Sequence, residues 1–155
     1  MHDARISELG ITLPGPFPPH DPLDAVVVHG GTARTSGCLP RTAAGELAAT
    51  GLLGRDVTTK DGAEAAALCA LNAVSLLRTA LGTLDAIDRI LTVTVFVACV
   101  DDFVEQPGVA DGASQVLEQI FGTSGRHTRS AIGVAALPRG AAVEVEVTVA
   151  LQDAT

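Results

Sequence analysis

The stretch that decides the fold is the C-terminal sequence Gly125-Arg126-His127-Thr128-Arg129-Ser130-Ala131-Ile132-Gly133-Val134-Ala135-Ala136-Leu137-Pro138, followed by Val143-Glu144-Val145-Glu146-Val147. Its alternation of apolar and polar side chains predicts two strands, over 129–136 and 142–150. Arg129, Glu144 and Glu146 interrupt strands that otherwise carry small and apolar residues. Strands of this kind normally keep charge at their ends, so the pattern indicates a functional site.

A turn at 138–141 predicts that the last two strands pair with each other, with Ala135 opposite Glu144. On that register one face is apolar and suited to receive helices, and it holds Ile132, Val134, Ala136, Val143, Val145, Val147 and Val149. The other face is small and polar, and it holds Arg129, Ala131, Gly133, Ala135, Glu144, Glu146 and Thr148.

Two side chains on the polar face have complementary chemistry. The planar guanidinium of Arg129 can hold a carboxylate through two parallel hydrogen bonds. The carboxylate of Glu144 can orient or deprotonate a water molecule. On the predicted register they lie about six residues apart, which is roughly 20 Å. We therefore expect them to meet across a subunit interface, in a site that only the oligomer completes. The alternative is that both are ordinary solvated surface charges.

The rest of the chain supplies the other elements of the fold. Strands are predicted over 25–29 and 33–36, joined at Gly30-Gly31, and over the β-branched segment 90–97. Long helices are predicted over 61–81, capped by Thr59 and ended by Gly82, and over 112–121, capped by Asp111. A short helix is predicted over 6–11, and the prolines that follow and residues 41–58 should be irregular. The order β-β-α-β-α-β-β predicts an α+β sandwich with both long helices on one face of a sheet.

Composition narrows the function. The chain has 155 residues, 47% of them apolar, which fits one domain with a substantial core. Its net charge of -8 and its lack of Trp and Tyr argue against a nucleic-acid partner. The apolar runs near Val26 and Val93 are too short to span a membrane, and no signal segment is evident. The three widely spaced cysteines predict reduced thiols and a cytoplasmic protein.

From about residue 22 onward the chain resembles the RidA/YjgF family, the reactive-intermediate enamine/imine deaminases. The resemblance rests on Thr35-Ser36-Gly37-Cys38-Leu39-Pro40, Gly45-Glu46-Leu47, Asn72, Val95-Phe96-Val97, Asp102-Phe103, Arg129-Ser130, Ala136-Leu137-Pro138 and Val143-Glu144-Val145-Glu146. Segments 4–11, 111–114 and 125–127 are similar to a longer bacterial branch that is often labelled endoribonuclease L-PSP.

The resemblance implies a chorismate-mutase-like (YjgF-like) fold with a mixed sheet, in one domain over 1–155 with 1–22 as an N-terminal extension. It implies a homotrimer with sites between subunits, where Arg129 binds the substrate carboxylate and Glu144 positions the hydrolytic water. The implied reaction is hydrolysis of small enamines or imines, such as 2-aminoacrylate, to a 2-keto acid and ammonia, as in 2-iminobutanoate/2-iminopropanoate deaminases. It implies no metal and no organic cofactor.

The chain departs from that family's pattern at several pocket positions. The usual pocket tyrosine falls at Leu23, the frequent pocket cysteine at Ala131, and the glutamine after Ser-Gly at Cys38. Ser36 is expected to form a pocket wall, and His127 is expected at the rim as a proton donor. These departures leave substrate choice open. The alternatives are a non-catalytic small-carboxylate binding or regulatory protein and, supported only by the label of relatives, an endoribonuclease.

Overall fold

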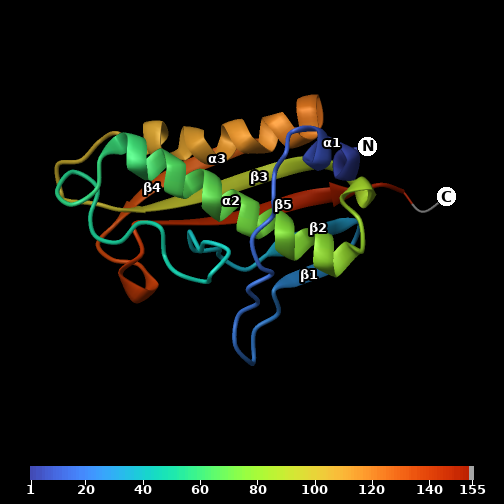
Figure 1. Ribbon diagram of the computed structural model, residues 1–155, viewed down its shortest axis with the longest axis horizontal. Coiled ribbons are helices and arrows are strands. Elements are labelled where there is room, and N and C mark those ends of the chain that lie inside the picture. The colour runs from blue at the N-terminus through green and yellow to red at the C-terminus, as the bar shows by residue number, and fades with distance from the viewer. Residues whose placement is uncertain (154–155) are drawn as a thin grey trace.

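Two long helices cover one face of a five-stranded sheet in the computed structural model, which describes residues 1–153 (Figure 1). The order of strands and long helices is the predicted one, and the α+β fold class is confirmed. The elements are α1 (His2–Glu8), β1 (Val26–His29), β2 (Thr32–Thr35), α2 (Thr59–Leu81), β3 (Ile87–Ala98), α3 (Gln106–Phe121), β4 (Thr128–Val134) and β5 (Val143–Leu151), with short 3-10 turns η1 (Leu84–Ala86), η2 (Gly122–Gly125) and η3 (Pro138–Gly140).

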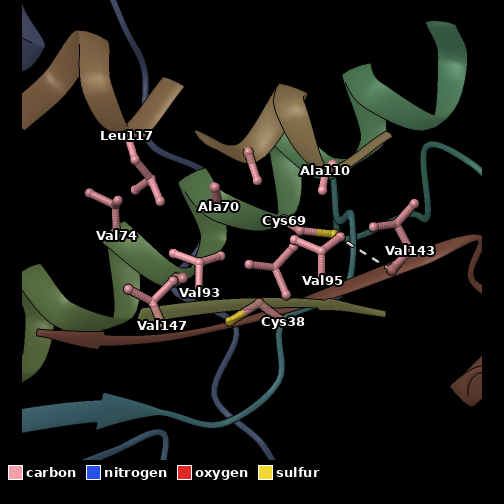
Figure 2. Close-up of a cluster of buried hydrophobic side chains, with 14 of the residues drawn as sticks. Cys38, Cys69, Ala70, Val74, Val93, Val95, Ala110, Leu117, Val143 and Val147 are labelled. Carbon is pink, nitrogen blue, oxygen red and sulfur yellow. Dashed lines mark hydrogen bonds between the residues drawn. The ribbon is translucent and has the colours of Figure 1, made fainter. Parts of the chain in front are cut away.

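The core lies between the helices and the sheet. Val74 of α2 and Leu117 of α3 point toward Val93 of β3 and Val147 of β5, as Figure 2 shows, and all four side chains are buried. The length and composition of α2 would allow it to cross a membrane, but more than half of its apolar stretch is buried inside the domain. Its apolar surface is therefore used in packing against α3 and the sheet.

The ends of α2 follow capping chemistry. The helix begins after Thr58, whose side chain accepts a hydrogen bond from the backbone N–H of Asp61 at 3.1 Å. The cap is therefore Thr58, and the prediction of Thr59 was one residue late. Gly82 ends the helix with a left-handed φ of 80°, as predicted, because glycine adopts that conformation without steric cost.

Helix α3 begins six residues earlier than predicted. It starts at Gln106 with Pro107 in its first turn, so Asp111 lies inside the helix and is not its cap. Asp has a side chain that favours the N-cap position, which placed the predicted start directly after Asp111. A Cβ at Gly112 would lie 1.8 Å from the carbonyl oxygen of Ala63, so this glycine allows α2 and α3 to approach closely.

The sheet order is β1-β2-β5-β3-β4, and the predicted pairing of the last two strands is wrong. β1 and β2 form the predicted hairpin at Gly30-Gly31. Helix α3, however, connects β3 to β4 as a crossover, which makes β4 parallel to β3 and an edge strand. β5 then pairs antiparallel on the other side of β3, with Phe96 opposite Glu144.

This topology inverts the predicted faces of β4. Arg129 is in register with Val93, which is buried beneath the helices, so Arg129, Ala131 and Gly133 lie on the helix side. Ile132 is in register with Phe96 and therefore shares the open side with Glu144. The faces predicted for β5 are correct, with its valines toward the helices.

The N-terminal helix spans His2–Glu8 and not the predicted 6–11. It is anchored by the buried side chain of Ile6 and by an ion pair of 2.9 Å between Asp3 Oδ1 and Arg78 Nε. Residues 41–58 contain no helix or strand, as predicted. Leu53 within them is nevertheless fully buried, and its backbone forms an isolated β-bridge with Cys99.

Candidate functional site

Glu144 lines a cavity of about 270 Å³ at the side of the sheet where the chain enters from its proline-rich segment. The carboxylate packs on Gly37, where a Cβ would lie 2.0 Å from Glu144 Oε1. The segment after β2 is held there by backbone hydrogen bonds between Cys38 and Val145. The cavity is lined by Phe17, Pro18, Pro19, His20, Ser36, Gly37, Cys38, Leu39, Arg41, Asn72, Leu76, Pro138, Arg139 and Glu144.

The Glu144 carboxylate is poised to accept a proton. Partial burial, and secondarily the nearby charge of Glu146, raise the pKa of Glu144 above its ordinary value. Within residues 1–153 no cation lies within salt-bridge distance of Glu144, whereas Glu146 pairs with Arg34 at 3.3 Å. An unpaired, partly buried carboxylate with a raised pKa can act as a general base.

The raised pKa makes a prediction about stability. A carboxylate whose pKa is higher in the folded state than in the unfolded state costs stability when it is ionised, and the cost disappears as the pH falls below its unfolded pKa of about 4.3. Glu144→Gln should therefore raise the free energy of unfolding at pH 7, by less than about 1 kcal/mol because solvent screens the group. At about pH 4 the gain should vanish. Glu46→Gln, at an exposed position, makes the same change in net charge and should show no such pH-dependent gain.

Contact between Gly37 and Glu144 makes a second prediction. Gly37→Ala should destabilise the protein by about 1–2 kcal/mol, at the lower end for overpacking because the nearest atom ends a flexible side chain. In a Glu144→Ala background the added methyl group has room, so the same change should cost less. Urea unfolding of both single variants and the double variant measures the coupling. Equal costs in the two backgrounds would show that Glu144 does not occupy this position.

Two cationic side chains of this cavity were not identified from the sequence. Arg41 donates from Nη1 to the carbonyl oxygen of Gly45 at 2.7 Å, and Arg139 adopts a left-handed φ of 58° within η3. The flanking Pro138 and Gly140 mark a tight turn, which was the available signal for Arg139. With Glu144 they give the cavity both an acceptor and positive charge.

The remaining predicted residues of this region divide into two groups. Ser36 and Cys38 line the cavity, and Ser36 Oγ donates to the carbonyl oxygen of Asp24 at 2.6 Å. Burial, and secondarily the charge of Glu144, raise the pKa of Cys38 to about 12, which keeps the thiol protonated and unreactive. Leu23 is 53% exposed and does not line this cavity.

Arg129 lies in a different place, beside α3. Its Nη1 donates to Asp111 Oδ1 at 2.9 Å and to Ser114 Oγ at 3.1 Å, and its side chain is 21% exposed. His127 and Arg129 line a second cavity of about 280 Å³, with Ser114 and Arg126. Ala131, two residues along β4, packs partly against the core. Within one chain the structure therefore brings Ser36, Cys38 and Glu144 together, and His127 and Arg129 together, in separate cavities.

A family model, described as "YjgF/chorismate_mutase-like, putative endoribonuclease", matches residues 3–149 of the sequence. The chain belongs to the YjgF/chorismate mutase-like family. This confirms the resemblance to RidA/YjgF proteins that the sequence motifs indicated. Among curated proteins the chain is similar to protein TCP17 of Trypanosoma cruzi, with 42% identity over 97% of this chain and 94% of that protein.

Solved structures support the same assignment. A protein of Shewanella oneidensis MR-1 named as a putative endoribonuclease is 30% identical, with a TM-score of 0.93 over 97% of this chain and 99% of the other. TdcF of Escherichia coli, solved with bound serine, is 25% identical, with a TM-score of 0.60 over 88% of this chain and 92% of TdcF. The YjgF/chorismate mutase-like fold with its mixed five-stranded sheet is therefore shown for this chain.

Proposed function

We propose that this protein is a cytoplasmic homotrimeric deaminase that hydrolyses small carboxylate-bearing enamines or imines to 2-keto acids and ammonia. The observation that carries the proposal is Glu144, an unpaired and partly buried carboxylate with a raised pKa in a cavity of small-molecule size. Membership of the YjgF family supports it, since many members are imine deaminases.

The proposed reaction needs one base and one anchor. The imine form of 2-aminoacrylate has an electrophilic carbon between its methyl group and its carboxylate. Glu144 takes a proton from water as the water oxygen bonds to that carbon, and the proton passes to the imine nitrogen, which gives a carbinolamine. Glu144 then takes the proton of the carbinolamine hydroxyl group and delivers it to the nitrogen as the C–N bond breaks, so that ammonia and pyruvate leave. The base should contribute about 10²–10⁴-fold to the rate.

Arg129 is proposed to anchor the substrate carboxylate at a site shared between subunits. Its Nη1 is already occupied, but no hydrogen bond from its Nε is found among the described residues, and its Nη2 makes only a long contact of 3.5 Å to the Pro107 carbonyl oxygen. The Nε and Nη2 edge can therefore hold a carboxylate through two hydrogen bonds. Serine bound to TdcF is itself a small carboxylate ligand, which supports this substrate class.

The open face of the sheet supports a homotrimer, which is the typical assembly of the family. Ile132 on β4 is 43% exposed and Val27 on β1 is 55% exposed, and both lie on the side that the helices leave uncovered. Exposed apolar strand residues of this kind favour burial against another chain. Light scattering of the purified protein measures the assembly, and a monomer would contradict the shared site.

The activity is tested directly with 2-aminoacrylate generated in the assay. Release of ammonia and pyruvate should exceed the spontaneous hydrolysis rate in proportion to protein concentration. A crystal soaked with pyruvate or 2-ketobutyrate should show the ligand carboxylate on Arg129 and its keto carbon near Glu144 of another subunit. No acceleration above the spontaneous rate would overturn the proposed activity.

A second candidate is a non-catalytic small-carboxylate binder. It is favoured by the ion pair of Arg129 with Asp111, which a ligand must compete with, and by Leu23 and Ala131 at positions where the family has pocket tyrosine and cysteine. A binder would be stabilised thermally by keto acids without turning over 2-aminoacrylate.

A further inference from the structure

Ser114 on α3 and His127, which the proposed deamination does not use, form a chain of hydrogen bonds with the proposed anchor Arg129. Ser114 Oγ lies 2.9 Å from His127 Nε2, and His127 Nδ1 lies 2.6 Å from the carbonyl oxygen of Gly125. Arg129 Nη1 lies 3.1 Å from Ser114 Oγ. All of these atoms belong to one chain, and they line the second cavity of about 280 Å³.

The hydrogen positions in this cluster follow from elementary chemistry. The Gly125 carbonyl oxygen can only accept, so His127 Nδ1 carries the proton and Nε2 presents its lone pair. The Ser114 hydroxyl must then donate to Nε2. Arg129 can only donate, so its Nη1–H points at a lone pair of Ser114 Oγ. The serine proton is therefore directed at a base while a cation contacts the serine oxygen.

We propose that Ser114 is a nucleophile for acyl transfer from small activated esters. A serine whose hydroxyl is bonded to a histidine, itself oriented by a third group, is the arrangement that activates serine in unrelated enzymes. Here the Gly125 carbonyl fixes the His127 tautomer. The guanidinium of Arg129 stabilises negative charge at the serine oxygen and at the adjacent oxyanion.

The step balances within this cluster. Ser114 Oγ bonds to the ester carbonyl carbon as its proton passes to His127 Nε2, and the carbonyl oxygen becomes an oxyanion. The oxyanion collapses, the bond to the leaving alcohol breaks, and His127 returns the proton to that alcohol. An acyl-serine remains, which water hydrolyses by the same route. The step uses Arg129, which is also the proposed carboxylate anchor, but it requires neither Glu144 nor a second subunit. Loss of deamination in Glu144→Gln would therefore leave acetylation of Ser114 intact.

The probe is p-nitrophenyl acetate, followed by release of p-nitrophenol and by peptide mass mapping of the quenched protein. The expected result is one acetyl group on Ser114, absent in Ser114→Ala. Ser130→Ala is the matched control, because Ser130 is an exposed serine on the neighbouring strand, and it should label like the natural protein. His127→Gln keeps Ser114 and should slow its acetylation by about 10²–10⁴-fold.

Two outcomes would overturn the inference. One is the absence of acetyl-Ser114 in the natural protein under conditions that release p-nitrophenol elsewhere on the chain. The other is acetylation of Ser114 at the same rate in His127→Gln, which would mean that the histidine does not act as its base. Circular dichroism of each variant checks that the fold is retained.

Discussion

Replacement of Glu144 by glutamine should lower the rate of pyruvate and ammonia formation from 2-aminoacrylate by about 10²–10⁴-fold, with little change in KM. Glutamine fills the same space on Gly37 but cannot take a proton from water. Steady-state formation of keto acid, with the spontaneous rate subtracted, measures the effect. If Glu144→Gln keeps more than about a tenth of the natural rate, Glu144 is not the general base.

Glu146→Gln is the matched control for this prediction. Glu146 lies two residues along the same strand, on the same side of the sheet, and its charge is paired with Arg34. It does not line the Glu144 cavity, so its loss should change the rate at neutral pH only a few-fold. A loss as large as that of Glu144→Gln would indicate that the strand itself, and not the base, had been disturbed.

The pH profile follows from the raised pKa of Glu144. A general base acts in its deprotonated form, so kcat/KM should fall as the pH is lowered through that raised pKa. The acid limb should therefore lie above the ordinary glutamate value of about 4.3. Glu146 is the second cause of the shift, so Glu146→Gln should move the limb to lower pH. If the acid limb does not move in Glu146→Gln, a group other than Glu144 produces that limb.

The sequence was sufficient for the order of elements because periodicity and caps are local signals. The β-branched run of β3, the left-handed Gly82 and the Gly30-Gly31 hairpin all depend on residues near them in the chain. The start of α3 was predicted six residues late because Asp111 has the side chain of a typical N-cap, whereas the helix begins at Gln106. Gly112 is tolerated in the helix because the backbone of α2 passes close to it.

Strand pairing could not be read from the last two strands alone. Their alternation describes each strand separately, and the short turn favoured a hairpin. The decisive fact was the crossover through α3, which makes β4 parallel to β3 and separates it from β5. That single change moved Arg129 to the helix side, beside Asp111 and Ser114. The candidate residues were nevertheless identifiable, because isolated charges among small residues mark Arg129 and Glu144 without knowledge of the pairing.

Arg129→Ala should lower kcat/KM for 2-aminoacrylate by about 10²–10³-fold, since two charge-assisted hydrogen bonds to the substrate carboxylate are lost at about 1.5–3 kcal/mol each, less what water restores. Arg129→Lys keeps the charge but not the planar guanidinium. Its kcat/KM should therefore lie between those of the natural protein and of Arg129→Ala. The fold should persist, because the ion pair lost with Asp111 involves a partly exposed carboxylate. Turnover of 2-aminoacrylate at the natural rate by Arg129→Ala would show that Arg129 does not anchor the substrate carboxylate.

Combining the two inactive variants tests whether neighbouring subunits share the site. In one chain Glu144 and Arg129 line separate cavities, on different sides of the sheet. If each site takes Arg129 from one subunit and Glu144 from the next, co-expression of Arg129→Ala with Glu144→Gln creates some sites with both natural residues. Random assembly of equal amounts makes about one quarter of the sites intact, so about a quarter of the natural activity should return. The control is a mixture of the two variants purified separately, in which subunits have not exchanged between homotrimers. This mixture should remain inactive. A site built from a single chain would give no recovery in either case, because every chain then lacks one of the two groups.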